Sequence, residues 1–481
     1  MARVHKRDAL AVGAILILLV GWWLKIRELF PQVEFIDWIV SPLRATFDDG
    51  VKAMVTFRHD GFSRHVSIIW AAGTGRACGS SIPCINTMAF LPVAGAALAF
   101  YALARVVRLG ALTALTVVVV WLVSEPTFEV LTWQATLHDR LAALFVPGML
   151  LAVVLILRRL PLRAAWAVPA GGALAAAGLL AVNTKEPAWV LLPMVVAAPL
   201  VLGRSLTEVR DGALILAPAA LLMAIHVITD TLALRDDPAS QAHVSGGDVW
   251  QNLPILSSHA VPGGLFVVLP LLALAMYGAV EGWRHRDRLP EAAEGGRYGA
   301  WLGIGAVFGW VIPARTEFAS AFYMLVPLAV AAIAIACGLR ALLLVHRPVA
   351  PWRVLAGAGA AYLALVCVGV SLHSRWDAYG QVVVNDARFR KSLPELARIH
   401  AAHPANQFQF RMEYGPAARF VTASSAANFW RHVVPRVSTA DYLHPSVTTA
   451  DTCGSAPGVT VLSYDVDTRL VGACAPPPPR R

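Results

Sequence analysis

Charged side chains are scarce in this sequence. Asp, Glu, Lys and Arg make up 15% of the 481 residues, and 57% of the residues are hydrophobic. A soluble globular protein has about 25% charged residues, so an ordinary soluble enzyme is excluded. Long apolar runs joined by short polar connections instead predict a polytopic membrane protein.

The signatures of several function classes are also missing. The sequence has no zinc-type spacing of cysteine, histidine and carboxylates, no Gly-Lys-Ser/Thr phosphate loop and no dinucleotide fingerprint. The net charge of +10 comes from short Lys and Arg clusters between apolar runs rather than from a continuous basic face. We therefore expect no nucleic-acid partner.

The apolar runs predict about eleven membrane-spanning helices, because a helix needs roughly 20 mostly apolar residues to cross a bilayer. Their approximate limits are 9–29, 86–104, 109–125, 137–157, 164–183, 187–203, 212–230, 262–283, 298–313, 318–338 and 353–372. The first run lacks a small-residue cleavage site and leads into Lys25-Ile26-Arg27, which predicts a retained span rather than a signal peptide. The expected fold class is mostly α, in a transmembrane domain covering residues 1–372.

The distribution of arginine predicts the orientation. When the connections are numbered by the span they follow, the even-numbered ones carry the basic residues. The odd-numbered short connections carry almost none. These basic residues are Arg105, Arg108, Arg158, Arg159, Arg163, Arg204, Arg210, Arg284, Arg286, Arg288, Arg297, Arg340, Arg347 and Arg353. By the positive-inside rule, the N-terminus is predicted on the cytoplasmic side of a plasma (inner) membrane. The loop at 30–85, the loop at 231–261 and the chain after 373 are then outside.

Four of the six cysteines fall in these predicted outer segments. Cys78 and Cys84 form one close pair, and Cys453 and Cys474 form another. An oxidising compartment favours disulfides, so we expect both pairs to be bonded. Cysteine played no part in the orientation, and the two observations agree.

The chain after about residue 373 has a soluble composition. Apolar residues recur at helical spacing over 378–403 and again over 416–430, and strands are expected at 407–412 and 459–466. Residues 373–481 are therefore predicted to form a small exported α/β domain that ends in a disordered Pro-rich tail.

Ionisable residues at the rim of a membrane are costly unless paired or hydrated, and each is a candidate for function. On the predicted outer side they gather in four segments, which suggests one shared polar cavity. The first of these segments follows the first span, and the others lie between spans three and four, five and six, and nine and ten. In that order the main candidates are Asp48, Asp49, Asp60 and Arg64; Glu129, Trp133, His138, Asp139 and Arg140; Lys185 and Glu186; and Arg315 and Glu317.

Simpler interpretations stay open for the same residues. Asp49-Gly50 and Asp60-Gly61 are also turn-forming pairs, and Glu186 also suits the start of a helix. His138-Asp139-Arg140 also reads as an ion cluster that satisfies itself, and Trp133 as an interfacial anchor. His259, in the loop before the eighth span, is too isolated in the sequence to be given a role.

The order of motifs resembles that of a known superfamily. Asp48-Asp49 after the first span is followed by Phe62-Ser63-Arg64-His65 and by Ile82-Pro83-Cys84-Ile85-Asn86. Glu125-Pro126 to Glu129 with Leu131-Thr132-Trp133 comes next, and then Lys185-Glu186-Pro187 with Leu192-Pro193. This series, over residues 9–340, resembles the multi-spanning GT-C glycosyltransferases, in particular the protein O-mannosyltransferase-like branch and the bacterial lipid-A or cell-wall branches. Ser63-Arg64-His65 departs from the aromatic-Arg-Pro pattern of that superfamily.

The resemblance implies a transferase that takes a sugar from a polyprenyl-phosphate carrier and attaches it to a glycan, lipid or protein acceptor on the outer face. It implies inversion at the anomeric carbon and a first-loop aspartate as general base, with Asp49 first, Asp48 second and Asp60 third. A second aspartate would position the acceptor or a divalent cation. No other cofactor is expected. The leaving phosphate needs a fixed cation, for which Arg64, Arg140, Lys185 and Arg315 are candidates.

Two other classes stay as alternatives to this function. A surface-polysaccharide polymerase or ligase would also face outward, but it would transfer a whole glycan. A transporter or flippase of lipid-linked sugars would show interrupted helices at mid-membrane and internal two-fold similarity, and the sequence has neither by eye.

Overall fold

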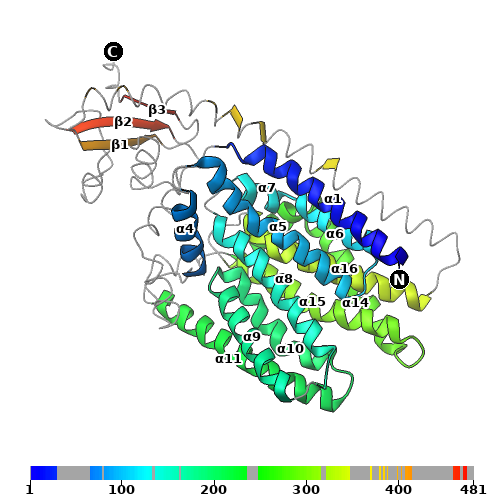
Figure 1. The fold of residues 1–481 in the computed structure, drawn as a ribbon. Coiled ribbons are helices and arrows are strands. Elements are labelled where there is room, and N and C mark those ends of the chain that lie inside the picture. Colours follow the sequence, from blue (N-terminus) through cyan, green and yellow to red (C-terminus); the bar gives the residue numbers. More distant parts are fainter. Residues whose placement is uncertain are drawn as a thin grey trace.

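The computed structural model describes residues 2–29, 65–78, 81–132, 136–161, 164–235, 248–315, 321–346, 407–413, 459–465 and 470–473, with isolated residues between 369 and 402. Most of the described chain is helical (Figure 1). The helices are α1 Ala2–Ile26, α4 His65–Cys78, α5 Ile82–Val106, α6 Ala111–Leu122, α7 Glu125–Thr132, α8 Leu137–Leu157, α9 Ala164–Val182, η2 Glu186–Val190, α10 Leu191–Leu202, α11 Leu206–Arg235, α13 Val249–Ala260, α14 Leu265–Arg284, α15 Pro290–Ala314, η3 Ala321–Met324 and α16 Leu325–His346.

Six helical segments of the described chain are long and apolar enough to cross a membrane: α1, α5, α8, α11, α14, and η3 continued by α16. A seventh is the pair α6 and α7, which bends by 53°. The helix α9 and the pair η2–α10 are shorter apolar segments. The chain is thus a multi-pass membrane protein of the mostly α class, as predicted.

Helices occupy ten of the eleven predicted spans, and the eleventh, 353–372, lies almost wholly outside the described residues. The agreement follows from a local requirement. In a bilayer each backbone amide and carbonyl must be hydrogen-bonded within its own segment, so a long apolar run has few options besides a helix. Three α-helices of the described chain were not predicted, namely α4, α7 and α13, which have 14, 8 and 12 residues. Each is shorter than a span.

The helices α14, α15 and α16 form a tightly packed group whose contacts depend on glycine. A Cβ atom placed on Gly296 of α15 would lie 2.8 Å from the Ala279 carbonyl oxygen of α14. A Cβ atom on Gly338 of α16 would meet the backbone of Ala275 in α14. Small residues let membrane helices approach closely, so glycine sets the spacing of this group.

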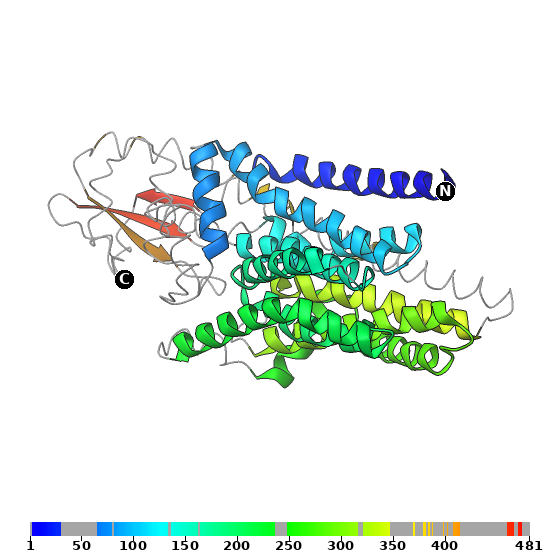
Figure 2. The ribbon, with the colours of Figure 1, turned by 60° about the horizontal axis from the view of Figure 1, so that its bottom comes forward.

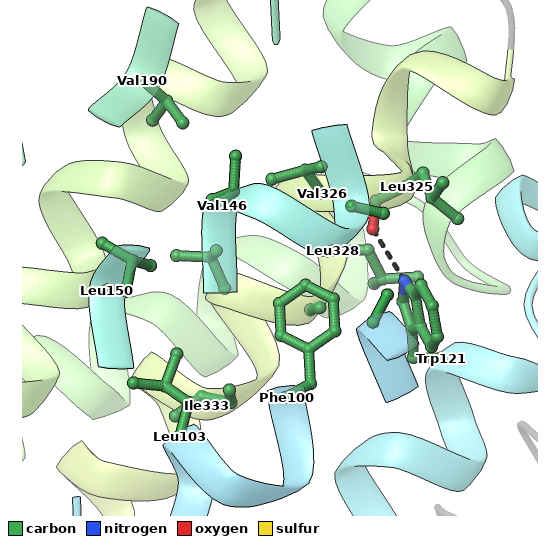
Figure 3. Packing of buried hydrophobic residues seen from close by; sticks show 14 of the residues in the cluster. Phe100, Leu103, Trp121, Val146, Leu150, Val190, Leu325, Val326, Leu328 and Ile333 are labelled. Atoms are coloured by element: carbon green, nitrogen blue, oxygen red, sulfur yellow. Dashed lines mark hydrogen bonds between the residues drawn. The ribbon is translucent and has the colours of Figure 1, made fainter. Parts of the chain in front are cut away.

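The core of the bundle joins helices that are far apart in the sequence (Figure 3). Phe100 of α5 packs edge-on against Trp121 of α6, with ring centroids 5.2 Å apart. The Trp121 indole Nε1 donates a hydrogen bond of 2.7 Å to the Leu325 carbonyl of α16. A buried indole N–H needs such a partner, and here the partner fixes α6 against α16.

The start of α5 fastens two other elements. The Asn86 side-chain amide donates to the carbonyls of Ile26, Arg27 and Leu29 at 3.1, 3.0 and 2.7 Å, which satisfies the end of α1. Carbonyls at a helix C-terminus lack intrahelical donors. Asn86 therefore acts as a cap supplied by another helix.

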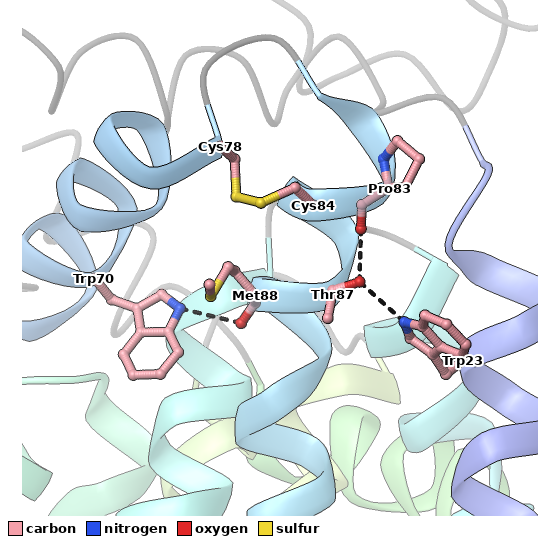
Figure 4. The surroundings of a disulfide bond; sticks show 7 residues. All are labelled: Trp23, Trp70, Cys78, Pro83, Cys84, Thr87 and Met88. Carbon is pink, nitrogen blue, oxygen red and sulfur yellow. Dashed lines mark hydrogen bonds between the residues drawn. A yellow bond between two sulfur atoms is a disulfide. The ribbon is translucent and has the colours of Figure 1, made fainter.

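A disulfide bond joins Cys78 at the end of α4 to Cys84 at the start of α5, which confirms one predicted pair (Figure 4). The Trp70 indole also donates to the Met88 carbonyl at 3.2 Å. The helix α4 crosses the end of the bundle at a steep angle (Figures 1 and 2). Cys453 and Cys474 lie outside the described residues, so their pairing stays a prediction.

Three strands are described near the C-terminus: β1 Gln407–Glu413, β2 Val459–Asp465 and β3 Leu470–Ala473. The central strand β2 pairs parallel to β1, with Gln407 opposite Val459, and antiparallel to β3, with Leu462 opposite Ala473. The first two strands coincide with those expected from alternation. The expected helices at 378–403 and 416–430 lie mostly outside the described residues, and the domain division at 373 stays a prediction.

Candidate functional site

One end of the helix bundle collects most of the polar residues singled out from the sequence. The segments that meet there are α7, the first turn of α8, η2 after α9, α13, the end of α15 and η3. They meet because successive long helices run in opposite directions, so that alternate turns fall at the same end. This end also carries α4 (Figure 1).

A buried ion pair lies at the centre of this end. The Lys185 ammonium Nζ is 2.8 Å from Asp139 Oδ2, and the two side chains are 2% and 3% exposed. Lys185 is the residue before η2 and has an extended backbone, with φ −168° and ψ 158°. Asp139 lies in the first turn of α8, where a carboxylate is favoured by the helix dipole. His138 Nε2 is 3.3 Å from the same Asp139 oxygen.

Two aromatic rings of η3 complete the environment of Lys185. Its ammonium lies 4.3 Å from the ring centroid of Phe322 and 4.3 Å from that of Tyr323. A cation over a ring face is attracted by the ring quadrupole. The rings and the carboxylate together compensate the loss of water around a buried cation. Sequence reasoning missed both aromatics, because they sit at the start of an apolar run and look like ordinary core residues.

Glu129 of α7 reaches the same short helix. Its Oε2 accepts a hydrogen bond of 2.9 Å from the Phe322 backbone amide. Glu129 is half-buried. Lys185 and Glu129 therefore touch two sides of η3, one through ring faces and the other through the backbone. Four chain segments, at 129, 139, 185 and 322, are connected by these contacts.

A second acid–base pair lies beside this group. His259 of α13 places Nδ1 3.1 Å from Glu125 Oε1 of α7, and the two side chains are 30% and 27% exposed. These residues are 134 positions apart in the sequence. The sequence around His259 therefore gives no sign that Glu125 is its partner.

The other predicted residues differ in their surroundings. Arg140 is buried, and its guanidinium donates to the carbonyls of Ala89, at 2.9 Å, and Val130. Arg140 thus holds α5, α7 and α8 together. Glu186 is half-buried in η2, and Arg315 is exposed at the C-cap of α15.

Several of the strongest sequence candidates are not covered. Asp48, Asp49, Asp60, Arg64, Trp133 and Glu317 lie outside the described residues. The described chain resumes directly after Arg64 at His65, where α4 begins. The helix α4 packs Val66 and Ala71 against Leu137 and Leu141 of α8. The end of the first loop is therefore tied to the helix that carries His138 and Asp139.

Within the part of the chain that the structure describes, no three His, Cys, Asp or Glu side chains gather to hold a metal ion. The arrangement offers other chemistry. It combines a half-buried carboxylate, a buried ammonium–carboxylate pair and a more exposed imidazole–carboxylate pair at one end of a membrane bundle. Such groups can accept a proton from a hydroxyl and stabilise a developing negative charge.

No protein-family model matches this chain, and no curated protein matches it. Among solved structures, the oligosaccharyltransferase of Archaeoglobus fulgidus is similar in three forms. The apo crystal structure has a TM-score of 0.45 and 12% identity, with 88% of this chain and 63% of that chain covered. The form with an inhibitory peptide and a dolichol-phosphate has a TM-score of 0.45 and 11% identity, with 94% and 69% covered. The form with Zn and sulfate has a TM-score of 0.42 and 13% identity, with 92% and 64% covered.

The chain thus spans less than two thirds of the length of the first of these structures. A likeness at this level assigns no residue role to this chain.

Proposed function

We propose that this chain is a membrane glycosyltransferase that moves a sugar from a polyprenyl-phosphate carrier to an acceptor hydroxyl at the end of the bundle near α4. The proposal takes its reaction class from the ordered sequence motifs that resemble the GT-C superfamily. The observation that carries it is the convergence of Glu129, Asp139 and Lys185 at that end. Ionisable groups buried in a membrane protein are rarely retained without a function.

The reaction needs a base and an anion-binding group. A carboxylate removes the proton of the acceptor hydroxyl while the hydroxyl oxygen attacks the anomeric carbon of the sugar. The bond between that carbon and the carrier phosphate breaks, and the phosphate leaves on the lipid. A single direct displacement inverts the anomeric centre. Asp49 is the proposed base, with Asp48 and then Asp60 as the next choices.

The surroundings of Arg140, Lys185 and Arg315, the candidate cations that the structure describes, suggest a division of roles. Lys185 is paired with Asp139, and Arg140 donates to two backbone carbonyls. Both are buried and already engaged, so we assign them to positioning the polar end. Arg315 is exposed at the same end. We assign Arg315, together with Arg64, to the leaving phosphate, because a guanidinium binds phosphate in a bidentate manner.

The comparison of envelope glycans and glycoproteins with and without this chain tests the function. Mass spectrometry should find one monosaccharide missing from one acceptor class when the chain is deleted. An unchanged monosaccharide pattern with shorter polysaccharides would contradict single-sugar transfer and favour a polymerase. The acceptor that loses mass identifies whether a glycan, a lipid or a protein is modified.

Asp49→Asn tests the proposed base. Loss of a general base lowers the rate by about 10²–10⁴-fold, so transfer in reconstituted membranes should fall by that factor at equal protein level. The matched control is Asp287→Asn, since Asp287 has a side chain 90% exposed at the opposite end of the bundle. Full activity of Asp49→Asn would remove Asp49 from the role. In the same assay Arg315→Gln should raise KM for the lipid-phosphate donor more than KM for the acceptor.

A further inference from the structure

The opposite end of the bundle holds an arginine cluster that the proposed reaction does not use. Three arginines from three different connections approach one carboxylate, Glu294, near the start of α15. Arg108 Nε is 3.0 Å from Glu294 Oε2, Arg158 Nη2 is 3.3 Å from Oε1, and Arg204 Nη2 is 3.7 Å from Oε1. We call Glu294 and these three arginines the Glu294 cluster.

The charges in the Glu294 cluster do not balance. Three guanidinium groups face one carboxylate, which leaves two positive charges. The side chains of Arg108 and Arg204 are 49% and 60% exposed, whereas Glu294 is 16% exposed. The Arg158 side chain is less exposed, at 27%, and its Nε donates to the Tyr298 hydroxyl at 2.9 Å. Arg108 and Arg204 therefore present the excess positive charge to the surroundings.

The backbone at Arg108 indicates that its side chain has a specific use. Arg108 has φ +66° and follows the end of α5, where the Leu109 amide donates to the Ala104 carbonyl at 3.0 Å. This left-handed position after a helix is usually filled by glycine, because a Cβ atom is disfavoured there. The chain carries an arginine instead, and its guanidinium reaches Glu294.

The position of the cluster limits what it can meet. Arg108 follows α5, Arg158 is the C-cap of α8, Arg204 follows α10, and Glu294 lies near the start of α15. Two of these helices, α5 and α8, are long and apolar enough to span, so their ends lie at the level of lipid headgroups. Arginines in loops can fix the topology of a membrane protein wherever their side chains lie. That role does not require three guanidinium groups to meet at one carboxylate.

We infer that the Glu294 cluster binds the phosphate group of an anionic phospholipid headgroup, through Arg108 and Arg204. Basic pockets between membrane helices suit such headgroups, and two guanidinium groups supply paired N–H donors for phosphate oxygens. Glu294 orients the arginines and keeps them from folding away. This inference is independent of the proposed transferase reaction, since the cluster lies at the other end of the bundle.

Native mass spectrometry of the full chain in mixed micelles tests this inference. The unmodified chain should retain phosphatidylglycerol in preference to phosphatidylcholine. In the double variant Arg108→Gly, Arg204→Gln, retention of phosphatidylglycerol should fall by about tenfold or more. Retention of phosphatidylcholine should not change. Glycine suits the backbone at 108, so the single variant Arg108→Gly should keep the thermal unfolding temperature and still bind less phosphatidylglycerol.

The matched control is Arg210→Gln. Arg210 has a side chain 72% exposed on the first turns of α11 and pairs with its neighbour Asp211 at 3.0 Å. It should bind phosphatidylglycerol as the unmodified chain does. An equal loss in Arg210→Gln and in the double variant would overturn the inference, because it would reduce binding to general surface charge. Displacement of phosphatidylglycerol by low millimolar inorganic phosphate would overturn the lipid assignment and make the ligand a free anion.

Discussion

Lys185 is almost fully buried, and its contacts explain how a charged side chain is tolerated at this position. Its ammonium has lost water but gained Asp139 at 2.8 Å and two ring faces at 4.3 Å. A buried pair of this kind contributes little net stability compared with apolar residues, but removal of one partner leaves the other charge uncompensated. The two residues are therefore coupled, and single substitutions overstate the contribution of each.

Lys185→Met is expected to lower the free energy of unfolding by about 3–5 kcal/mol, because Asp139 then stays buried but loses the Lys185 ammonium. The double variant Asp139→Asn, Lys185→Met should recover most of that loss. Denaturant titration in detergent micelles measures both values. Lys6→Met is the control, since Lys6 is exposed in α1 and should change stability by no more than about 0.5 kcal/mol.

The double variant distinguishes a structural role of the Asp139–Lys185 pair from a role in the reaction. If the double variant regains stability but not sugar transfer, the charges serve the reaction and not only the fold. A loss below about 1 kcal/mol in Lys185→Met would contradict the buried pair, because surface ion pairs contribute in that range.

The residues of this end show where sequence reasoning stops. His138-Asp139-Arg140 suggested either a site or a self-satisfied cluster, and the structure gives the three side chains different partners. Asp139 contacts both its neighbour His138 and Lys185, 46 positions away, and Arg140 donates to backbone carbonyls on α5 and α7. The sequence shows that a charged residue in an apolar run is costly to bury. It does not show which residue will be its partner, because the partner depends on how the helices pack.

At the scale of elements, the spacing of α14, α15 and α16 depends on glycines that leave no room for a side chain. A Cβ atom on Gly338 would meet backbone atoms of Ala275, which cannot rotate away as a flexible side chain would. By contrast, a Cβ atom on Gly303 of α15 would meet only the Met276 sulfur, at 3.8 Å. The two positions provide a matched pair.

Gly338→Ala is expected to destabilise the protein by about 1–3 kcal/mol, the usual range for overpacking. Gly303→Ala should leave stability unchanged or raise it slightly, since alanine favours helix more than glycine does. Thermal unfolding in the same detergent compares the two. Equal unfolding temperatures for both variants would show that α14 and α16 are not in close backbone contact.

The α-helices that the sequence did not predict have a common property. The short helices α4, α7 and α13 lie at the end with the polar residues, between or beside spans. Their hydrophobic runs are too short to stand out when a window of about 20 residues is used. The long spans were predictable because a bilayer leaves an apolar run few conformations. The short helices depend on tertiary contacts, such as the Cys78–Cys84 bond that holds α4.

At the scale of the whole molecule, the two ends of the bundle differ in chemistry. One end combines Glu129, Asp139, Lys185 and the Glu125–His259 pair. The other end carries the Glu294 cluster and further arginines. By the positive-inside rule, we expect the arginine end in the cytoplasm and the mixed acid–base end outside. An oxidising outer compartment also suits the Cys78–Cys84 bond beside the acid–base end.

Cysteine labelling in intact cells tests this orientation. Ser258 of α13 and Thr207 of α11 are both exposed and lie at opposite ends of the bundle. A membrane-impermeant maleimide should label Ser258→Cys from outside and should label Thr207→Cys only after the membrane is opened. Cys337 is buried and should give little background, which the unmodified chain measures. The reverse labelling pattern would place the acid–base end in the cytoplasm, where the disulfide would be reduced and an outward-facing acceptor would be out of reach.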